Sequence, residues 1–221
     1  MNALADFAGD FEVHLTVTTR AIATGALESH AAAVERWAAS RGLKFTHIVL
    51  ARGRTPSQPM LTLRTAGTLS EAHARTASTA AALRAAGFTV TRTKIEAAPW
   101  NAGVPASDGE PHAPGRYFEH HVKLLLAADE DLGALTALVV PHAAHLSHNA
   151  RRVRADGRQE RFVTQRCRDV GAGTAGERLD ALTTALNAAE HEIASVEREY
   201  VVFDDDESLD DGWIDEGRNG R

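Results

Sequence analysis

Two short segments of the 221-residue chain place acidic, imidazole and other polar side chains at every second position. The first carries Glu12, His14 and Thr16, and the second carries Glu119, His121 and Lys123. Alternate residues of a β-strand point to the same face of its sheet, so each set is expected to share one face. Paired imidazoles suit acid–base chemistry, because one can accept a proton while the other donates one.

The two segments open the equivalent halves of an internal repeat. Residues 11–17 align with residues 118–124, and the elements that follow match in the same order. Alanine-rich stretches predict helices at residues 26–40, 70–86, 131–144 and 175–189. The remaining strands are expected around residues 46–47, 61–64 and 89–97 and, in the second copy, around 147–148, 163–166 and 193–203.

This order of strand, helix, two strands, helix and strand resembles the ferredoxin-like fold in each copy. The resemblance implies an α+β protein with antiparallel sheets, a strand order of 4-1-3-2 in each half and one sheet face without helices. The expected domains are residues 8–98, a linker rich in glycine and proline at 99–115, residues 116–203, and an acidic C-terminal extension at 204–221.

The uncovered faces are expected to gather ionisable side chains from several strands. The same alternation adds Thr62, Arg64, Arg92, Lys94 and Glu96 in the first copy and Thr164, Arg166, Ser195, Glu197 and Glu199 in the second. A solvated sheet face could carry such residues without any function. If the two faces turn toward each other, they form a polar, partly desolvated cleft in which pKa values shift.

The tetrapeptide that begins at His14 resembles the His-x-Thr/Ser motif of the 2H phosphoesterases. The resemblance implies that His14 and His121 transfer protons and that Thr16 binds phosphate, with Arg64, Lys94, Lys123 and Arg166 holding the anion. Lys123 departs from the motif, because the family has threonine or serine there, and the family's motifs do not usually lie on the opening strand. The leading hypothesis is therefore a phosphoesterase-type hydrolase acting on a small phosphate ester, a nucleotide or an RNA end.

Two alternative functions involve other ligands. One alternative is a divalent metal bound by Glu12 and His14, or by Glu119 and His121, with Glu96 or Glu199 as a further ligand. Sets of histidine and carboxylate ligands suit zinc, iron or manganese. The Glu-x-His-x-Lys segment also resembles the Glu-x-Glu-x-Lys strand of triphosphate tunnel enzymes, which implies a polyphosphate and a metal. The other alternative is a noncatalytic module that binds a ligand or an assembly partner. The sequence does not identify the substrate, the cofactor or the oligomeric state.

Composition excludes several other classes of protein. The net charge of −6 disfavours tight nonspecific duplex binding, so nucleic acid is expected only as a short or single-stranded substrate. Cys167 is the only cysteine, which excludes an intramolecular disulfide. No secretory signal and no apolar stretch of about 20 residues is present, so a cytoplasmic protein without a membrane segment is expected. The arginine-rich residues 151–168 are expected either to hold an anion or to pair with the acidic extension.

A few residues outside these sets have simpler interpretations. His120 interrupts an apolar row and is expected to be a hydrogen-bonded core residue. His142, His145 and His148 are interpreted as residues near the end of a helix, with metal binding as the alternative. Trp100 and Trp213 are interpreted as anchors that dock the linker and the C-terminal extension, with stacking on a base or sugar as the alternative.

Overall fold

A computed structural model describes residues 6–18, 24–110, 113–152 and 154–214. In the first half the elements are β1 (Ala8–Thr18), α1 (Thr24–Ala39), β2 (Lys44–Leu50), β3 (Ser57–Thr68), α2 (Leu69–Ala85) and β4 (Thr89–Ala97). In the second they are β5 (Tyr117–Leu126), α3 (Leu132–Val139), η1 (Val140–His142), β6 (Ala144–Asn149), β7 (Gln159–Arg168), α4 (Ala172–Ala188), β8 (Glu192–Asp204) and η2 (Glu207–Asp210).

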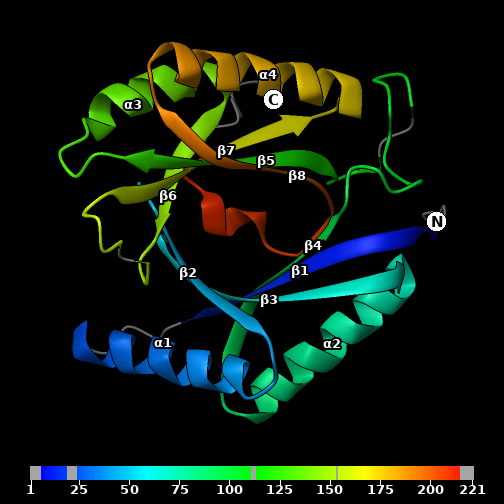
Figure 1. Cartoon of the computed structure of the whole chain (residues 1–221). Coiled ribbons are helices and arrows are strands. Elements are labelled where there is room, and N and C mark those ends of the chain that lie inside the picture. The colour runs from blue at the N-terminus through cyan, green and yellow to red at the C-terminus, as the bar shows by residue number, and fades with distance from the viewer. Residues whose placement is uncertain (1–5, 19–23, 111–112, 153, 215–221) are drawn as a thin grey trace.

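The eight strands form one closed, antiparallel barrel in the order β1-β3-β2-β6-β7-β5-β8-β4. Each half keeps the predicted order 4-1-3-2, so the α+β fold of two ferredoxin-like repeats is confirmed. The halves join where β2 pairs with β6 and where β4 pairs with β8. In Figure 1, α1 and α2 cover one side of the barrel and α3 and α4 cover the other. The helix-free faces therefore line the interior, and the polar cleft between the repeats is the inside of the barrel.

Alternation along the strands separates an apolar exterior, under the helices, from a polar interior. Val13 and Leu15 are fully buried in the core of the first half, and Val122 and Leu124 are fully buried in that of the second. His120, which interrupts the apolar row, is 2% exposed, and its Nδ1 lies 3.1 Å from Gln165 Oε1, so the predicted core histidine is confirmed.

Helix α3 ends earlier than the predicted range of 131–144. Pro141 lacks a backbone N–H, and Ala143 adopts a left-handed conformation with φ of 53°, so the chain turns and enters β6 at Ala144. His145 and His148 therefore lie on a strand, where a spacing of three residues puts them on opposite faces. The interpretation as residues near a helix end is wrong for His145 and His148 and correct for His142, which is the last residue of η1.

The linker packs against the start of α4. Gly171 N–H donates to Asp108 Oδ1 at 2.7 Å, and Ala172 N–H donates to the Pro105 carbonyl at 2.9 Å. A side chain at Gly171 would meet the backbone of Ser107, because its Cβ would lie 2.3 Å from the Ser107 carbonyl carbon. No helix in the described part of the chain is long and apolar enough to cross a membrane.

Gly171→Ala is expected to lower the free energy of unfolding by about 1–3 kcal/mol, because the backbone of Ser107 would have to move. Denaturant unfolding followed by circular dichroism measures the change. Gly176→Ala is the matched control, since a Cβ there meets nothing within 4 Å and should stabilise α4 by up to about 1 kcal/mol. Equal stability of the two variants would contradict the proposed packing of the linker.

Candidate functional site

The imidazoles of the two repeats are held in the same way. In the strand register His14 lies opposite Thr62, and His121 lies opposite Thr164. In both cases the histidine Nδ1 lies 2.9 Å from the threonine Oγ1. The threonine fixes the orientation of each ring, so that Nε2 is directed to a different set of partners.

Those partners are carboxylates from neighbouring strands. His14 Nε2 lies 2.9 Å from Glu96 Oε2 on β4. His121 Nε2 lies 3.3 Å from Glu119 Oε2 and 3.4 Å from Glu199 Oε2, which come from β5 and β8. Each imidazole therefore lies between a hydroxyl group and at least one carboxylate.

Four acidic and imidazole side chains converge with the spacing that a metal ion requires of its ligands. Glu96, Glu119, His121 and Glu199 each offer one ligand atom, and these atoms all lie within 4.8 Å of one another. The side chains of Glu96 and Glu119 are 1% exposed. Glu96 Oε1 and Glu199 Oε2 are buried and accept no hydrogen bond from the described residues. Each of these oxygens has one cationic neighbour, since Glu96 Oε1 lies 2.6 Å from Lys94 Nζ and Glu199 Oε2 lies 3.4 Å from His121 Nε2.

The cations expected to hold a phosphate are already paired with carboxylates. Lys94 Nζ contacts Glu119 and lies 2.6 Å from Glu96 Oε1. Arg166 Nε donates to Glu119 Oε1 at 2.6 Å. Arg64 Nε donates to Glu12 Oε2 at 2.5 Å. This pair lies at the surface, and the side chain of Arg64 is 77% exposed. A phosphate group would therefore have to compete with these carboxylates.

The pKa values of the cluster reflect its excess of carboxylates. Burial raises the pKa of Glu199 to about 7, and the charge of Glu96 adds to the effect. Burial alone would lower the pKa of His121, but its interactions with Glu119 and Glu199 raise that pKa to about 10. The pKa of His14 is raised as well, because Glu96 outweighs the opposing effect of burial. The groups therefore retain protons that a bound metal ion would displace.

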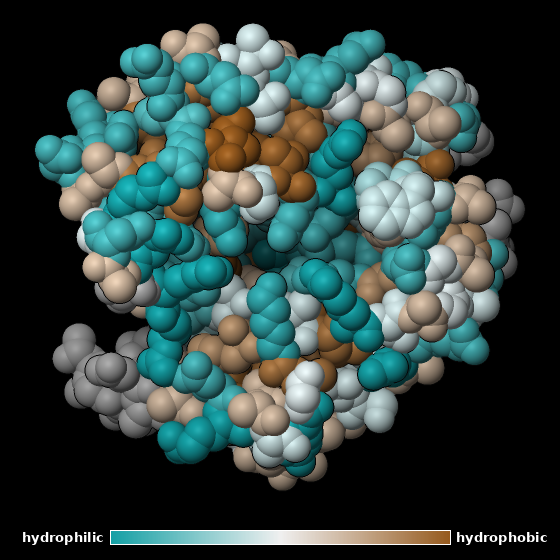
Figure 2. Space-filling view, in the orientation of Figure 1, coloured by the Kyte–Doolittle hydropathy of each residue, from teal (hydrophilic) through white to brown (hydrophobic). Residues whose placement is uncertain are grey.

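A cavity of about 140 Å³ lies inside the barrel, and both imidazoles line it. This volume accommodates several water molecules or a small ligand. In Figure 2 the face toward the viewer is hollowed at its centre, and hydrophilic side chains gather around the hollow. The predicted site residues that line the cavity are Glu12, His14, Thr16, Lys94, Glu119, His121, Arg166 and Glu199.

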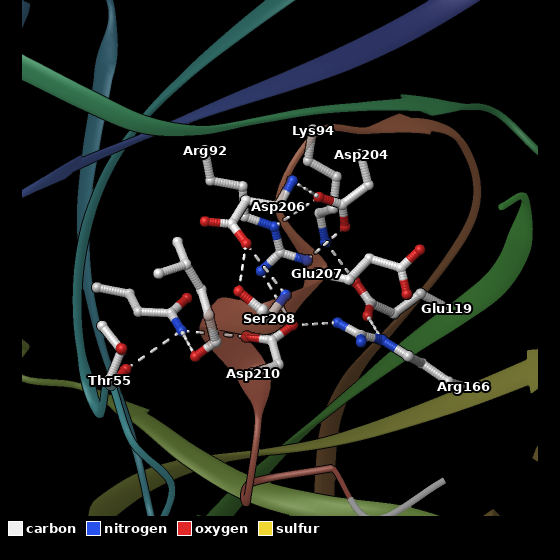
Figure 3. Close-up of polar contacts among 12 residues, drawn as sticks. Thr55, Arg92, Lys94, Glu119, Arg166, Asp204, Asp206, Glu207, Ser208 and Asp210 are labelled. Carbon is white, nitrogen blue, oxygen red and sulfur yellow. Dashed lines mark hydrogen bonds and ion pairs between the residues drawn. The ribbon is translucent and has the colours of Figure 1, made fainter. Parts of the chain in front are cut away.

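The C-terminal segment closes part of this cavity. Asp210 points between two arginines (Figure 3), and its Oδ2 lies 2.9 Å from Arg92 and 2.5 Å from Arg166. Gln58 Nε2 donates to the other oxygen of Asp210 at 3.1 Å. Trp213 Nε1 donates to the Leu146 carbonyl at 2.9 Å, so this tryptophan docks the extension as predicted. The segment is thus part of the barrel interior.

The arginine-rich residues are paired along their length. Arg166 pairs with Asp210, and Arg168 pairs with Glu207 of the same C-terminal segment. Further pairs in the strip are Arg151–Glu35, Arg154–Glu160 and Arg158–Glu192. Pairing with the acidic extension is therefore found for Arg166 and Arg168, whereas Arg151, Arg154 and Arg158 pair with carboxylates elsewhere in the fold.

Some predicted residues lie apart from the others, and some neighbours of the site were not predicted. Lys123 is not among the residues that line the cavity, and its Nζ lies 5.4 Å from the ring centroid of Phe162. Trp100 is 77% exposed, so its interpretation as a docking anchor is wrong. The residues of the cavity that sequence reasoning did not assign to the site include Gln58, Thr62, Arg92, Thr164 and Asp210. Alternation had placed both threonines and Arg92 on this face, whereas nothing pointed to Asp210, which lies outside the repeat.

No family model and no curated protein matches the chain. Among solved structures, the small subunit of acetolactate synthase from Thermotoga maritima shows 14% identity, covers 86% of this chain and 92% of its own, and has a TM-score of 0.29. A variant of chlorite dismutase from Candidatus Nitrospira defluvii shows 15% identity, with coverage of 92% and 93% and a TM-score of 0.29. These values identify no family and assign no function.

Asp210→Ala is expected to lower the free energy of unfolding by about 3–5 kcal/mol, because Arg92 and Arg166 would lose a shared buried counter-charge. Thermal and denaturant unfolding measure the loss. Asp211→Ala is the control, since its partner Arg54 is 79% exposed and the pair should contribute less than about 1 kcal/mol. Similar losses in the two variants would refute the structural role of Asp210.

Proposed function

We propose that the protein is a metalloenzyme with a divalent metal centre formed by Glu96, Glu119, His121 and Glu199. The observation that carries this proposal is the convergence of four ligand atoms within 4.8 Å. It is supported by two buried carboxylate oxygens, Glu96 Oε1 and Glu199 Oε2, which meet only the ion-pair partners Lys94 and His121 among the described residues. A metal ion would satisfy both oxygens and the imidazole at once.

The charge of the site favours a cation over a free phosphate. Three carboxylates meet two permanent cations, Lys94 and Arg166, and Arg166 is shared with Asp210. Buried charges are stable only when they are compensated, and without a metal ion the proton that His121 retains supplies the third positive charge. A divalent cation would replace that proton, whereas an additional anion would not. A mixture of one imidazole and three carboxylates suits zinc, iron or manganese.

The residues around the centre suit proton transfer. His14 contacts Glu96 through Nε2 and is oriented by Thr62 through Nδ1, so its ring is positioned beside one metal-binding group without being part of the set. A divalent metal supplies Lewis acidity and lowers the pKa of water that it binds. His14 then lies beside the centre as a proton-transfer group from the first repeat, and the internal cavity gives room for water.

Hydrolysis of a phosphate ester is the second candidate function, because two equivalent imidazoles line one cavity. Such a pair suits phosphodiester cleavage, because one ring activates the nucleophile and the other protonates the leaving oxygen. The surrounding carboxylates would repel the phosphate unless a metal ion were bound, so this candidate depends on the metal centre as well.

His121→Ala and Glu199→Gln are each expected to weaken metal binding by at least about 100-fold, because each removes one of four ligands. Elemental analysis of protein purified without a nickel column, followed by titration with Zn²⁺ and Mn²⁺, measures the effect. Glu197→Gln is the control, since Glu197 lines the same cavity outside the ligand set. Stoichiometric metal retained by both ligand variants would refute the centre.

Metal affinity is expected to rise between pH 6 and pH 8, because two ligands must lose a proton to bind the ion: Glu199, whose pKa is raised to about 7, and His121, whose pKa is raised to about 10. Titrations at pH 6 and pH 8 measure the change. Glu199→Gln, which cannot titrate, should show a smaller dependence. Equal affinity of the unaltered protein at both pH values would contradict the assignment of Glu199 as a ligand.

His14→Gln is expected to lower turnover by about 100-fold or more while metal content stays unchanged, because the variant loses the proton acceptor and keeps all four ligands. A substrate panel that includes phosphate monoesters, phosphodiesters and nucleotides, assayed with and without added metal, measures turnover. Full activity of the variant on the substrate that the unaltered protein converts would exclude proton transfer by His14.

A further inference from the structure

A second and larger cavity opens on the other side of the metal-binding cluster. This groove has a volume of about 990 Å³, and Glu96 and Glu199 lie on its wall. Glu12, Glu197 and Glu199 line both the groove and the inner cavity, whereas Asp210 and Trp213 line only the inner cavity. A ligand in the groove therefore reaches the cluster from the side that the C-terminal segment leaves open.

Two large apolar side chains that line the groove are exposed to solvent. Trp100, in the loop after β4, is 77% exposed, and Val196 on β8 is 41% exposed. Both line the groove. The third large hydrophobic side chain that is strongly exposed in the described part of the chain, Val140, lies elsewhere. An exposed indole beside a groove indicates a surface for an apolar or aromatic part of a ligand.

The charge of the groove is predominantly negative. Its wall carries five carboxylates, from Asp10, Glu12, Glu96, Glu197 and Glu199, and two guanidinium groups, from Arg64 and Arg198. Glu96 is 1% exposed, and its Oε1 accepts no hydrogen bond from the described residues, although Lys94 Nζ lies 2.6 Å away. Glu96 is therefore compensated by Lys94 from the inner cavity, and the other carboxylates carry the excess negative charge of the groove.

The charges that a metal ion leaves uncompensated are mainly acidic: two carboxylates, against the single guanidinium group of Arg198, which forms no ion pair with the described residues. Glu96 and Glu199 belong to the proposed centre, and Glu12 pairs with Arg64. Asp10 and Glu197 form no ion pair with any residue that the structure describes, and both line the groove. The groove is thus suited to a positive group beside these carboxylates, with an apolar group on the indole.

We propose that the groove binds a small organic cation, an amine that carries an aromatic or apolar group. Its ammonium group lies toward Asp10 and Glu197, and its apolar group lies on Trp100 and Val196. The face of an indole attracts cations, and the acidic wall disfavours anions of the same shape. Binding of the amine is inferred from the groove residues and does not require a metal ion. The role of the amine as the substrate of the metal centre rests on the proposed function.

Benzylamine, benzyl alcohol and benzoate test the charge preference, because they share one aromatic group and differ in charge at neutral pH. Calorimetric titrations at low salt are performed with protein as purified and with protein loaded with Zn²⁺. Benzylamine should bind at least about tenfold more tightly than benzoate, with benzyl alcohol between them. Added salt should weaken the binding of benzylamine more than that of benzyl alcohol.

Three variants test the location. Trp100→Ala should weaken benzylamine binding by about fivefold to tenfold, and Trp100→Phe should recover most of the loss because it retains an aromatic face. Glu197→Gln should weaken benzylamine binding and leave benzyl alcohol binding unchanged. Val140→Ala is the matched control for removal of an exposed apolar side chain, and it should have no effect.

Two results would overturn the inference. One is benzoate binding as tightly as benzylamine, which would show that the acidic wall does not select the ligand. The other is benzylamine binding that Trp100→Ala leaves unchanged, which would place the amine elsewhere. Metal content is measured in the same variants and should stay constant. If His121→Ala or Glu199→Gln loses metal and still binds benzylamine, only the groove's dependence on the metal centre is refuted. Trp100→Ala or Glu197→Gln should lose benzylamine binding and keep the metal. These two outcomes separate the two proposals.

Discussion

Closure of the eight-stranded sheet is the constraint on which the rest of this structure depends. A single ferredoxin-like repeat leaves one face of its sheet to water, where charged side chains need no partners. Pairing of β2 with β6 and of β4 with β8 turns both faces inward. Side chains such as Glu96 and Glu119 then become almost fully buried, and their charges have to be compensated within the barrel. The ion pairs, the raised pKa values and the proposed metal centre all follow from this burial.

The repeat is symmetric in its strands, but the completed site is not. Arg64 and Arg166 occupy equivalent positions opposite Glu12 and Glu119 in the strand register. Arg64 is largely exposed, whereas Arg166 is buried against Asp210 from the C-terminal segment. The segment therefore closes the interior on one side and leaves the groove on the other. This asymmetry explains why the second repeat provides the imidazole of the proposed centre and the first provides an imidazole beside it.

The proposed centre lies between two compartments with different properties. The inner cavity contains both imidazoles and is bounded by the C-terminal segment, and the groove has an acidic wall and an exposed indole. Glu199 lines both, so a charge placed in either compartment acts on the same carboxylate. In the proposed function, the groove would recognise the ligand, and proton transfer would take place in the sheltered cavity, where electrostatic interactions are stronger.

The sequence by itself determined the repeat, the ferredoxin-like strand order and the face on which each strand residue lies, because alternation is a local property of extended backbone. It thereby placed His14 and His121 on equivalent inward faces. Only the tertiary structure decided that the halves close into one barrel, that Glu96 meets residues of the second repeat, and that Asp210 enters the interior. These contacts depend on pairing between distant strand edges and on compensation of buried charges, and neither leaves a periodic signal in the chain. The end of α3 at Val139 depended on a proline and a left-handed residue that outweighed an otherwise helical composition.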